Sequence, residues 1–102
     1  MNAIHFEVRC KFGKLVRVTV ERWQHAMSKH PEMRGREDDV RRILEDPDEI
    51  RCDLKNSKAH RYHGKFDDHY ARVAVKFLDD EGFMITAFPE TKKGGGKVIW
   101  RK

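Results

Sequence analysis

Basic and hydroxyl side chains occur at alternate positions in three segments from the second half of the chain. They are Arg61, His63, Lys65, Arg72, Lys76 and Thr86. Residues two apart in a β-strand point to the same face, so three neighbouring strands would present these side chains on one surface. No carboxylate falls within this set. A face that only keeps a protein in solution would carry acids as well, so we favour a face that binds phosphates.

Imidazole, guanidinium, ammonium and hydroxyl groups can together cleave RNA without a metal ion. Attack by the 2′-hydroxyl on the adjacent phosphate needs a general base, a general acid and cations that stabilise the phosphorane. Imidazole titrates near neutral pH, and the guanidinium group holds phosphates well. The sequence shows neither the paired carboxylates of two-metal nucleases nor a Walker loop. The glycine run at 94–96 could cradle a phosphate, although a flexible hairpin connection is the simpler interpretation.

The histidine spacing argues against a metal site. His25 and His30 are five residues apart, about 140° around a helix, whereas zinc-binding helices use a spacing of four. His60 and His63 are three apart in a predicted strand and fall on opposite faces. His25 lies off the apolar stripe of its helix, while His30 lies on it, where a structural hydrogen bond is the commoner role. We therefore expect no metal and no cofactor.

Hydrophobic periodicity predicts the elements that must position these groups. Helical spacing predicts helices at about 20–29, after Thr19 as N-cap, and at about 37–45. Alternation predicts strands at 3–10, 15–18, 50–54, 59–66, 70–79, 82–88 and 97–101. We expect an α+β fold in which one or two N-terminal helices pack on an antiparallel sheet of about four to five strands.

The same alternation assigns side chains to the two faces of the sheet. The core-facing residues should be Tyr62, Phe66, Val73, Val75, Phe77, Phe83, Ile85 and Ala87. Met84, Thr86 and Phe88 should then lie on the other face with Arg61, His63 and Lys76. A register slip of one residue would exchange the faces, so the basic surface depends on these strand assignments.

Length and composition indicate one small basic domain covering residues 1–102. The formal net charge is +5, and it is concentrated at both ends around an acidic middle section. Net basicity favours a polyanionic partner, but only weakly. The two cysteines, Cys10 and Cys52, are expected to be buried or half-buried thiols in a reducing cytosol. With no leader and no long apolar run, we expect a cytoplasmic protein without a membrane partner.

Short motifs spread over nearly the whole chain resemble a family of small bacterial and phage proteins. They include Phe12-Gly13-Lys14, Arg22-Trp23-x-His25, His30-Pro31-Glu32-Met33, Asp46-Pro47-Asp48, Arg61-Tyr62, Val73-Ala74-Val75-Lys76, Gly82-Phe83-x-Ile85-Thr86-Ala87-Phe88 and Lys93-Gly94. The family is similar to the barnase–EndoU–colicin–RelE (BECR) nucleases and toxins. The resemblance implies that RNA binds the open face of the sheet. It also implies a tyrosine where Phe88 stands, so a hydroxyl that could be catalytic is missing.

The resulting expectation is a metal-independent ribonuclease, toxin-like or phage-associated. Its catalytic set is His25, Arg61, Lys76 and Thr86, with His25 as acid or base. Its substrate-binding set is His30, Tyr62, His63, Arg72 and Lys93. Two alternatives stay open. One is a non-catalytic nucleic-acid-binding module, and the other is an interaction partner held by an acidic antitoxin or immunity-type protein.

Overall fold

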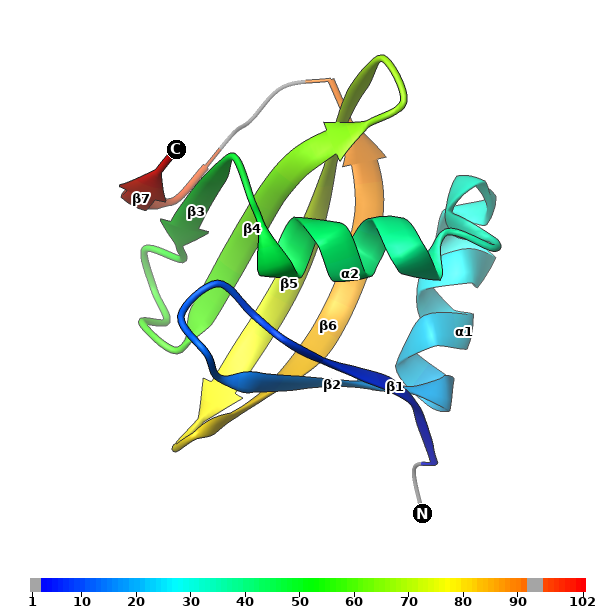
Figure 1. The fold of residues 1–102 in the computed structure, drawn as a ribbon, viewed down its shortest axis with the longest axis horizontal. Coiled ribbons are helices and arrows are strands. Elements are labelled where there is room, and N and C mark those ends of the chain that lie inside the picture. Colours follow the sequence, from blue (N-terminus) through cyan, green and yellow to red (C-terminus); the bar gives the residue numbers. More distant parts are fainter. Residues whose placement is uncertain (1–2, 92–94) are drawn as a thin grey trace.

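Two α-helices and seven β-strands make up the computed structural model, which describes residues 3–91 and 95–102 (Figure 1). The helices are α1 (Val20–Lys29) and α2 (Glu37–Glu45), with a short 3₁₀ turn, η1 (Pro31–Met33), between them. The strands are β1 (Ile4–Arg9), β2 (Leu15–Thr19), β3 (Glu49–Cys52), β4 (Ala59–Phe66), β5 (His69–Leu78), β6 (Glu81–Glu90) and β7 (Lys97–Arg101). The predicted α+β class is confirmed.

All seven strands belong to a single sheet with the order β1-β2-β6-β5-β4-β3-β7. Every pairing is antiparallel except that of β2 with β6, which is parallel. The prediction of four to five strands is therefore wrong in number, and the sheet is mixed rather than wholly antiparallel because one of its six pairings is parallel. The helices also follow two strands: β2 pairs with the start of β6, and β1 pairs with β2 at the edge of the sheet.

Helix α2 covers one face of the sheet, in front of β4 and β5 in Figure 1. Its buried side chains are Val40, Ile43 and Leu44, which share one side of the helix. Gly64 of β4 lets the helix approach closely, because a Cβ atom there would lie 2.7 Å from Cγ1 of Ile43. The face that α2 covers is called the core face here, and the opposite one is called the open face.

Helix α1 lies at the edge of the sheet beside β6, rather than on the core face (Figure 1). The Thr19 hydroxyl accepts a hydrogen bond from the Arg22 amide at 3.1 Å, which confirms the predicted N-cap. Trp23 and Ala26 bury the inner side of the helix. This position matters because the end of α1 can reach residues on the open face.

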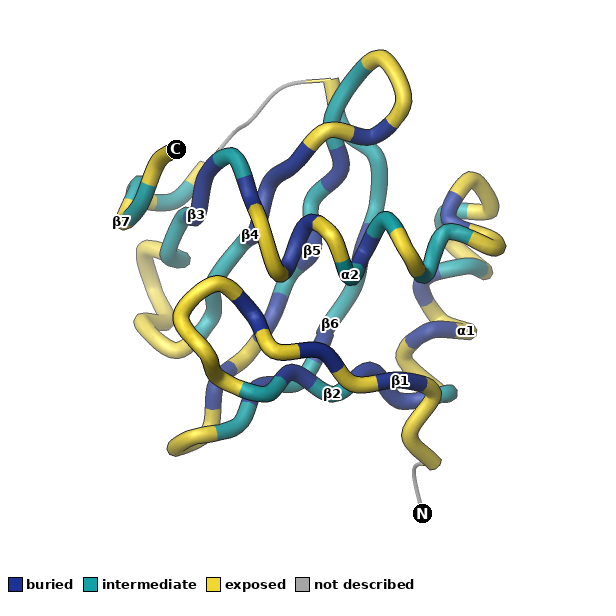
Figure 2. Tube along the Cα trace, in the orientation of Figure 1, coloured by how far each residue is buried: buried dark blue, intermediate teal, exposed yellow. Residues whose placement is uncertain are grey.

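A β-bulge in β6 divides its side chains between the faces differently from the prediction. Ala87 pairs with Val73, but the register shifts after Ala74, so that Val75 pairs with Met84 and Lys76 with Phe83. Ile85 is the extra residue, and it breaks the alternation. Met84 is therefore buried in the core and Phe83 lies on the open face, so the assignments of Phe83, Ile85 and Met84 were wrong. From Ala71 onward, buried positions of β5 alternate with half-buried or exposed ones (Figure 2).

The cysteines agree with one other expectation. Both cysteines are free thiols, Cys10 buried and Cys52 half-buried, as predicted. Within residues 3–91 and 95–102, neither helix has the length and apolar character that crossing a membrane requires.

Candidate functional site

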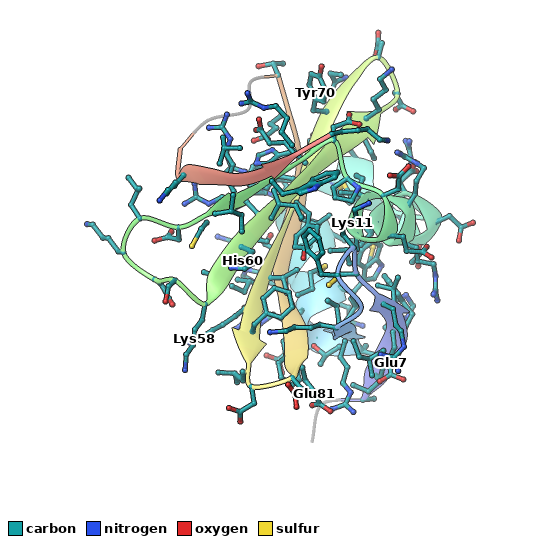
Figure 3. The ribbon with its side chains drawn as sticks, turned by 60° about the vertical axis from the view of Figure 1, so that its left-hand side comes forward. Glu7, Lys11, Lys58, His60, Tyr70 and Glu81 are labelled. Carbon is teal, nitrogen blue, oxygen red and sulfur yellow. The ribbon has the colours of Figure 1, made fainter. Side chains whose placement is uncertain are left out.

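Four strands contribute one row of side chains across the open face. Register pairs Glu49 of β3 with His63 of β4, His63 with Arg72 of β5, and Arg72 with Phe88 of β6. Paired residues point to the same side of a sheet, so these four side chains lie side by side across the four strands. Tyr70 marks the end of the sheet nearest this row, and Glu81 marks the opposite end (Figure 3).

Glu90 lies two residues after Phe88 on the same face of β6 and contacts the two central side chains of this row, His63 and Arg72. Its Oε1 lies 2.5 Å from Nδ1 of His63, and its Oε2 lies 3.1 Å from Nη2 of Arg72. The His63 side chain is fully buried, and the Glu90 side chain is 10 % exposed. Nε2 of His63 has no hydrogen-bond partner within the part of the chain that the structure describes. The carboxylate is therefore fixed between an imidazole and a guanidinium group.

The other arginines of the open face are also held by carboxylates. Glu49 is 2 % exposed and accepts from Arg51 at 2.6 Å and from Arg101 at 2.9 Å. Nη2 of Arg61 lies 2.9 Å from Oδ2 of Asp53. Such pairs restrict the rotamers of long side chains and keep their guanidinium groups in place.

These guanidinium groups lie near one another. Burial is the main cause that lowers the pKa of Arg72 below its ordinary value, and the positive charges of Arg61 and Arg51 lower it further. Glu90 acts in the opposite direction. Arg51, Arg61 and Arg72 thus form a cluster whose mutual repulsion would be relieved by a bound anion. We call these three residues the arginine cluster.

Gly95 lies against this cluster. Its carbonyl oxygen accepts a hydrogen bond from Nη1 of Arg51 at 3.2 Å, and a Cβ atom at Gly95 would lie 2.7 Å from Nη1 of Arg61. Its φ of +74° also favours glycine. Lys93, predicted to bind substrate, lies outside the described residues. The glycine run therefore approaches the predicted basic surface closely at Gly95.

Of the two histidines near α1, His30 is the one that reaches the row. The His30 ring stacks on Phe88 with 5.0 Å between the centroids and 27° between the planes, and Arg72 lies 5.3 Å from the same Phe88 ring. His25 is exposed on the outer side of α1, where its carbonyl oxygen accepts from the Ser28 hydroxyl. The stack brings an imidazole to the rim of the arginine cluster.

The remaining predicted site residues lie in three different places. Thr86 pairs with Ala74, whose other neighbour is Arg61, so Thr86 lies on the open face beside the cluster. Lys76 is on the same face but nearer the Glu81 end of β5. Tyr62 is on the core face, 2 % exposed, with its hydroxyl 3.4 Å from Sγ of Cys10. Burial raises the pKa of Tyr62 far above its usual range. The structure does not bring Tyr62 to the open face.

The expectation of an open face without carboxylates is wrong, because Glu49 and Glu90 both lie there. Both residues fall just outside the predicted strands, which began at residue 50 and ended at residue 88. Extending the alternation by one step of two residues, back from Arg51 and on from Phe88, would have identified both. Pro89, which pairs with Ala71, is the residue that obscured the end of β6.

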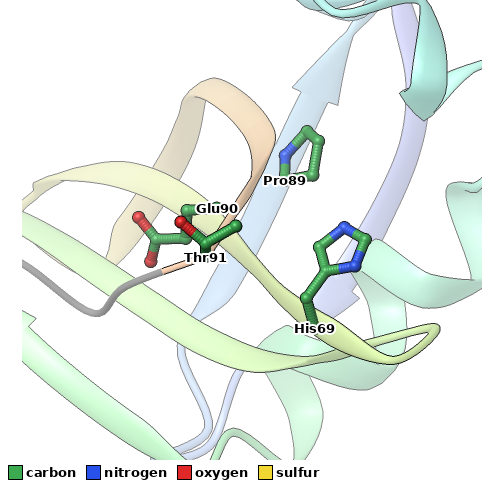
Figure 4. Close-up of a pocket in the computed structure, with 4 residues that line it drawn as sticks. All are labelled: His69, Pro89, Glu90 and Thr91. Atoms are coloured by element: carbon green, nitrogen blue, oxygen red, sulfur yellow. The ribbon is translucent and has the colours of Figure 1, made fainter.

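The two sides of the sheet are also visible at the end of β6. A pocket there is lined by His69, Pro89, Glu90 and Thr91. In Figure 4 the Glu90 carboxylate points away from the His69 ring, which lies near Pro89. His69 pairs with Phe66 on the core face, and the two rings meet edge to face with 5.8 Å between their centroids. Glu90 therefore belongs to the open face and His69 does not.

Comparison with known proteins gives no relative for this chain. No family model, curated protein or solved structure matches it. Among the described residues, no three or more His, Cys, Asp or Glu side chains gather where they could hold a metal ion.

Proposed function

We propose that this protein is a metal-independent ribonuclease that cleaves single-stranded RNA on its open face. One observation carries the proposal. A carboxylate, Glu90, is fixed between His63 and Arg72 in a cluster of guanidinium groups, and the His30 imidazole lies at its rim. These are the base, acid and cations that internal phosphoryl transfer requires.

The chemistry follows from these groups. The Glu90 carboxylate accepts the proton of the 2′-hydroxyl, whose oxygen then forms a bond to the adjacent phosphorus. The bond between phosphorus and the 5′-oxygen breaks, and a protonated His30 donates its proton to that leaving oxygen. The products are a 2′,3′-cyclic phosphate and a free 5′-hydroxyl. The proton gained by Glu90 and the proton lost by His30 are exchanged with water.

The arginine cluster stabilises the dianionic phosphorane. Its guanidinium groups are already held by carboxylates, so little reorganisation is needed when charge develops on the phosphate oxygens. We assign the acid to His30 rather than to His25, because only His30 contacts a residue of the row. Lys76 has no part in the chemical step of this proposal, because it lies four positions along β5 from Arg72.

The test is incubation of labelled RNA with the purified protein in EDTA, followed by analysis of the product ends. We expect cleavage with cyclic phosphate ends. His30→Ala should reduce kcat by about 10²-fold or more, which is the usual contribution of a general acid. The matched control is His25→Ala, which should keep wild-type activity. Loss of activity in the control alone would contradict the assignment of His30.

A second candidate function is a binding module that uses the same face without chemistry. Both oxygens of Glu90 already accept from His63 and Arg72, which favours a purely structural carboxylate. In that case RNA would bind without cleavage, and neither histidine variant would change its affinity. A protein that does not bind RNA but forms a stable complex with an acidic protein would instead be an interaction partner.

A further inference from the structure

A second group of side chains on the open face lies near the Glu81 end of the sheet and is separate from the arginine cluster. A pocket of about 230 Å³ opens between the start of α1 and strands β5 and β6. Its lining residues are Thr19, Arg22, Lys76, Leu78, Phe83, Met84 and Ile85. We infer that this pocket is a subsite for a nucleotide of single-stranded RNA, remote from the cleaved bond. The inference deepens the proposed ribonuclease function and depends on it.

The charges of this pocket differ from those of the arginine cluster. The arginines of the cluster are paired with Glu49, Asp53 and Glu90. The Arg22 and Lys76 side chains, both exposed, make no ion pair with any residue in 3–91 or 95–102. Two cations without carboxylate partners at the rim of one pocket are suited to a phosphate group.

The floor of the pocket supplies an apolar surface for a base. The β-bulge at Ile85 turns Phe83 to the open face, directly across from Lys76 in the register. Phe83 and Ile85 are half-buried, and Leu78 is 47 % exposed. Proteins that bind single strands combine cations that follow the backbone with aromatic rings on which bases stack. Phe83 is the aromatic ring beside these two cations.

The distance between the two groups requires a substrate longer than a dinucleotide. Lys76 follows Arg72 by four residues, which is about 13 Å along a strand at 3.3 Å per residue. One strand of duplex DNA advances about 3.4 Å along its axis per nucleotide, and an RNA strand stacked to the same degree would cover this distance in roughly four nucleotides. An RNA cut at the arginine cluster would therefore place a later nucleotide on Phe83, with its phosphate between Arg22 and Lys76.

The test compares two substrates, a dinucleoside monophosphate and an octanucleotide RNA, by kcat/KM in EDTA. We expect the wild type to prefer the octanucleotide. Lys76→Gln and Arg22→Gln should each lower kcat/KM for the octanucleotide about fivefold to tenfold and leave the dinucleoside rate unchanged. Phe83→Leu, which keeps an apolar side chain, should have a similar effect through lost stacking.

The matched control is Lys58→Gln. Lys58 lies at the same end of the sheet (Figure 3) but lines a pocket with His60 and Phe77 on the core side. This variant removes the same charge from the other side of the sheet and should leave both rates unchanged. Equal losses for Lys58→Gln and Lys76→Gln would mean that only the overall charge matters, and would overturn the subsite.

Failure of the subsite can be separated from failure of the proposed function. If the wild type cleaves both substrates and the Lys76, Arg22 and Phe83 variants match it, the subsite is wrong and the ribonuclease remains. If the wild type cleaves neither substrate, the proposed function fails. Fluorescence anisotropy with the labelled octanucleotide then decides the subsite alone: weaker binding by Lys76→Gln but not by Lys58→Gln supports it, and equal binding overturns it.

Discussion

At the scale of single residues, His60 shows how the environment of an imidazole changes its titration. Its ring lies 5.1 Å from the Phe77 ring, and its Nε2 lies 3.2 Å from the carbonyl oxygen of Ser57. Burial lowers the pKa of His60 below its usual value, and the charge of Lys14 lowers it further. The hydrogen bond to Ser57 acts in the opposite direction. Neutral imidazole is therefore favoured in the folded protein.

This shift predicts a dependence of stability on pH. An unfolded chain protonates its histidines near pH 6.5, whereas folded His60 protonates at a lower pH, so the unfolded state binds more protons between these values. The free energy of unfolding should therefore fall as the pH is lowered from about 7.5 through 6.5. Urea unfolding should show a smaller loss in His60→Gln than in the wild type over this range. Equal losses would contradict the prediction.

At the scale of elements, the packing of α2 on the sheet depends on Gly64. A methyl group at this position would meet Cγ1 of Ile43 at 2.7 Å, which is closer than packed carbon atoms can approach. We expect Gly64→Ala to lower the free energy of unfolding by about 1–3 kcal/mol through this overlap. The measurement is chemical denaturation of the purified variant.

The contact with Ile43 can be isolated by a double-mutant cycle. In an Ile43→Ala background the crowding atom is absent, so Gly64→Ala should cost much less there than in the wild type. An unchanged cost in the two backgrounds would mean that the alanine acts elsewhere in β4 and not through α2.

The elements also show what periodicity can and cannot predict. The two helices, the Thr19 cap and the open-face positions of Arg61, His63, Arg72 and Lys76 follow from local spacing and agree with the structure. The alternation does not reveal the bulge at Ile85. This one extra residue exchanges the faces of the β6 residues that precede it. The parallel pairing of β2 with β6 depends on contacts distant in sequence, which no local pattern specifies.

The candidate site was predicted only in part, because local spacing determines some of its residues and tertiary structure determines the others. Alternation brought the basic residues of β4 and β5 together on one face. The carboxylates of Glu49 and Glu90 were missed because they lie at strand ends, where boundaries are least certain from sequence. The stack of His30 on Phe88 depends on the position of α1 at the sheet edge, which is a property of the tertiary structure.

At the scale of the whole molecule, the two faces of the sheet have different tasks. One face is covered by α2 and supplies the hydrophobic core, while the other carries the arginine cluster and its carboxylates. The 22 Lys and Arg residues therefore overstate the charge available to RNA, because many of them are paired with the 17 acidic residues. Under the proposed function, this internal pairing would reduce the number of counterions that RNA binding releases.

This arrangement predicts a moderate salt dependence for RNA binding. Each phosphate contact to a single strand contributes about 0.7 to the slope of log affinity against log salt. With one phosphate at the arginine cluster and one between Arg22 and Lys76, we expect a slope of magnitude about 1.4 for a non-cleavable 2′-O-methyl octanucleotide. A slope above about 4 would mean that RNA contacts many more cations than these. Anisotropy titrations at several salt concentrations provide the measurement.

The central claim is that the Glu90 carboxylate takes a proton from RNA within the arginine cluster. The most direct measurement is kcat for octanucleotide cleavage by Glu90→Gln, which keeps the shape of the side chain and one of its two hydrogen-bond acceptors but cannot act as a base. We expect kcat to fall about 10²–10⁴-fold while the affinity for the 2′-O-methyl octanucleotide stays within about twofold. Wild-type kcat in Glu90→Gln would contradict the account, since the carboxylate would then have only a structural role.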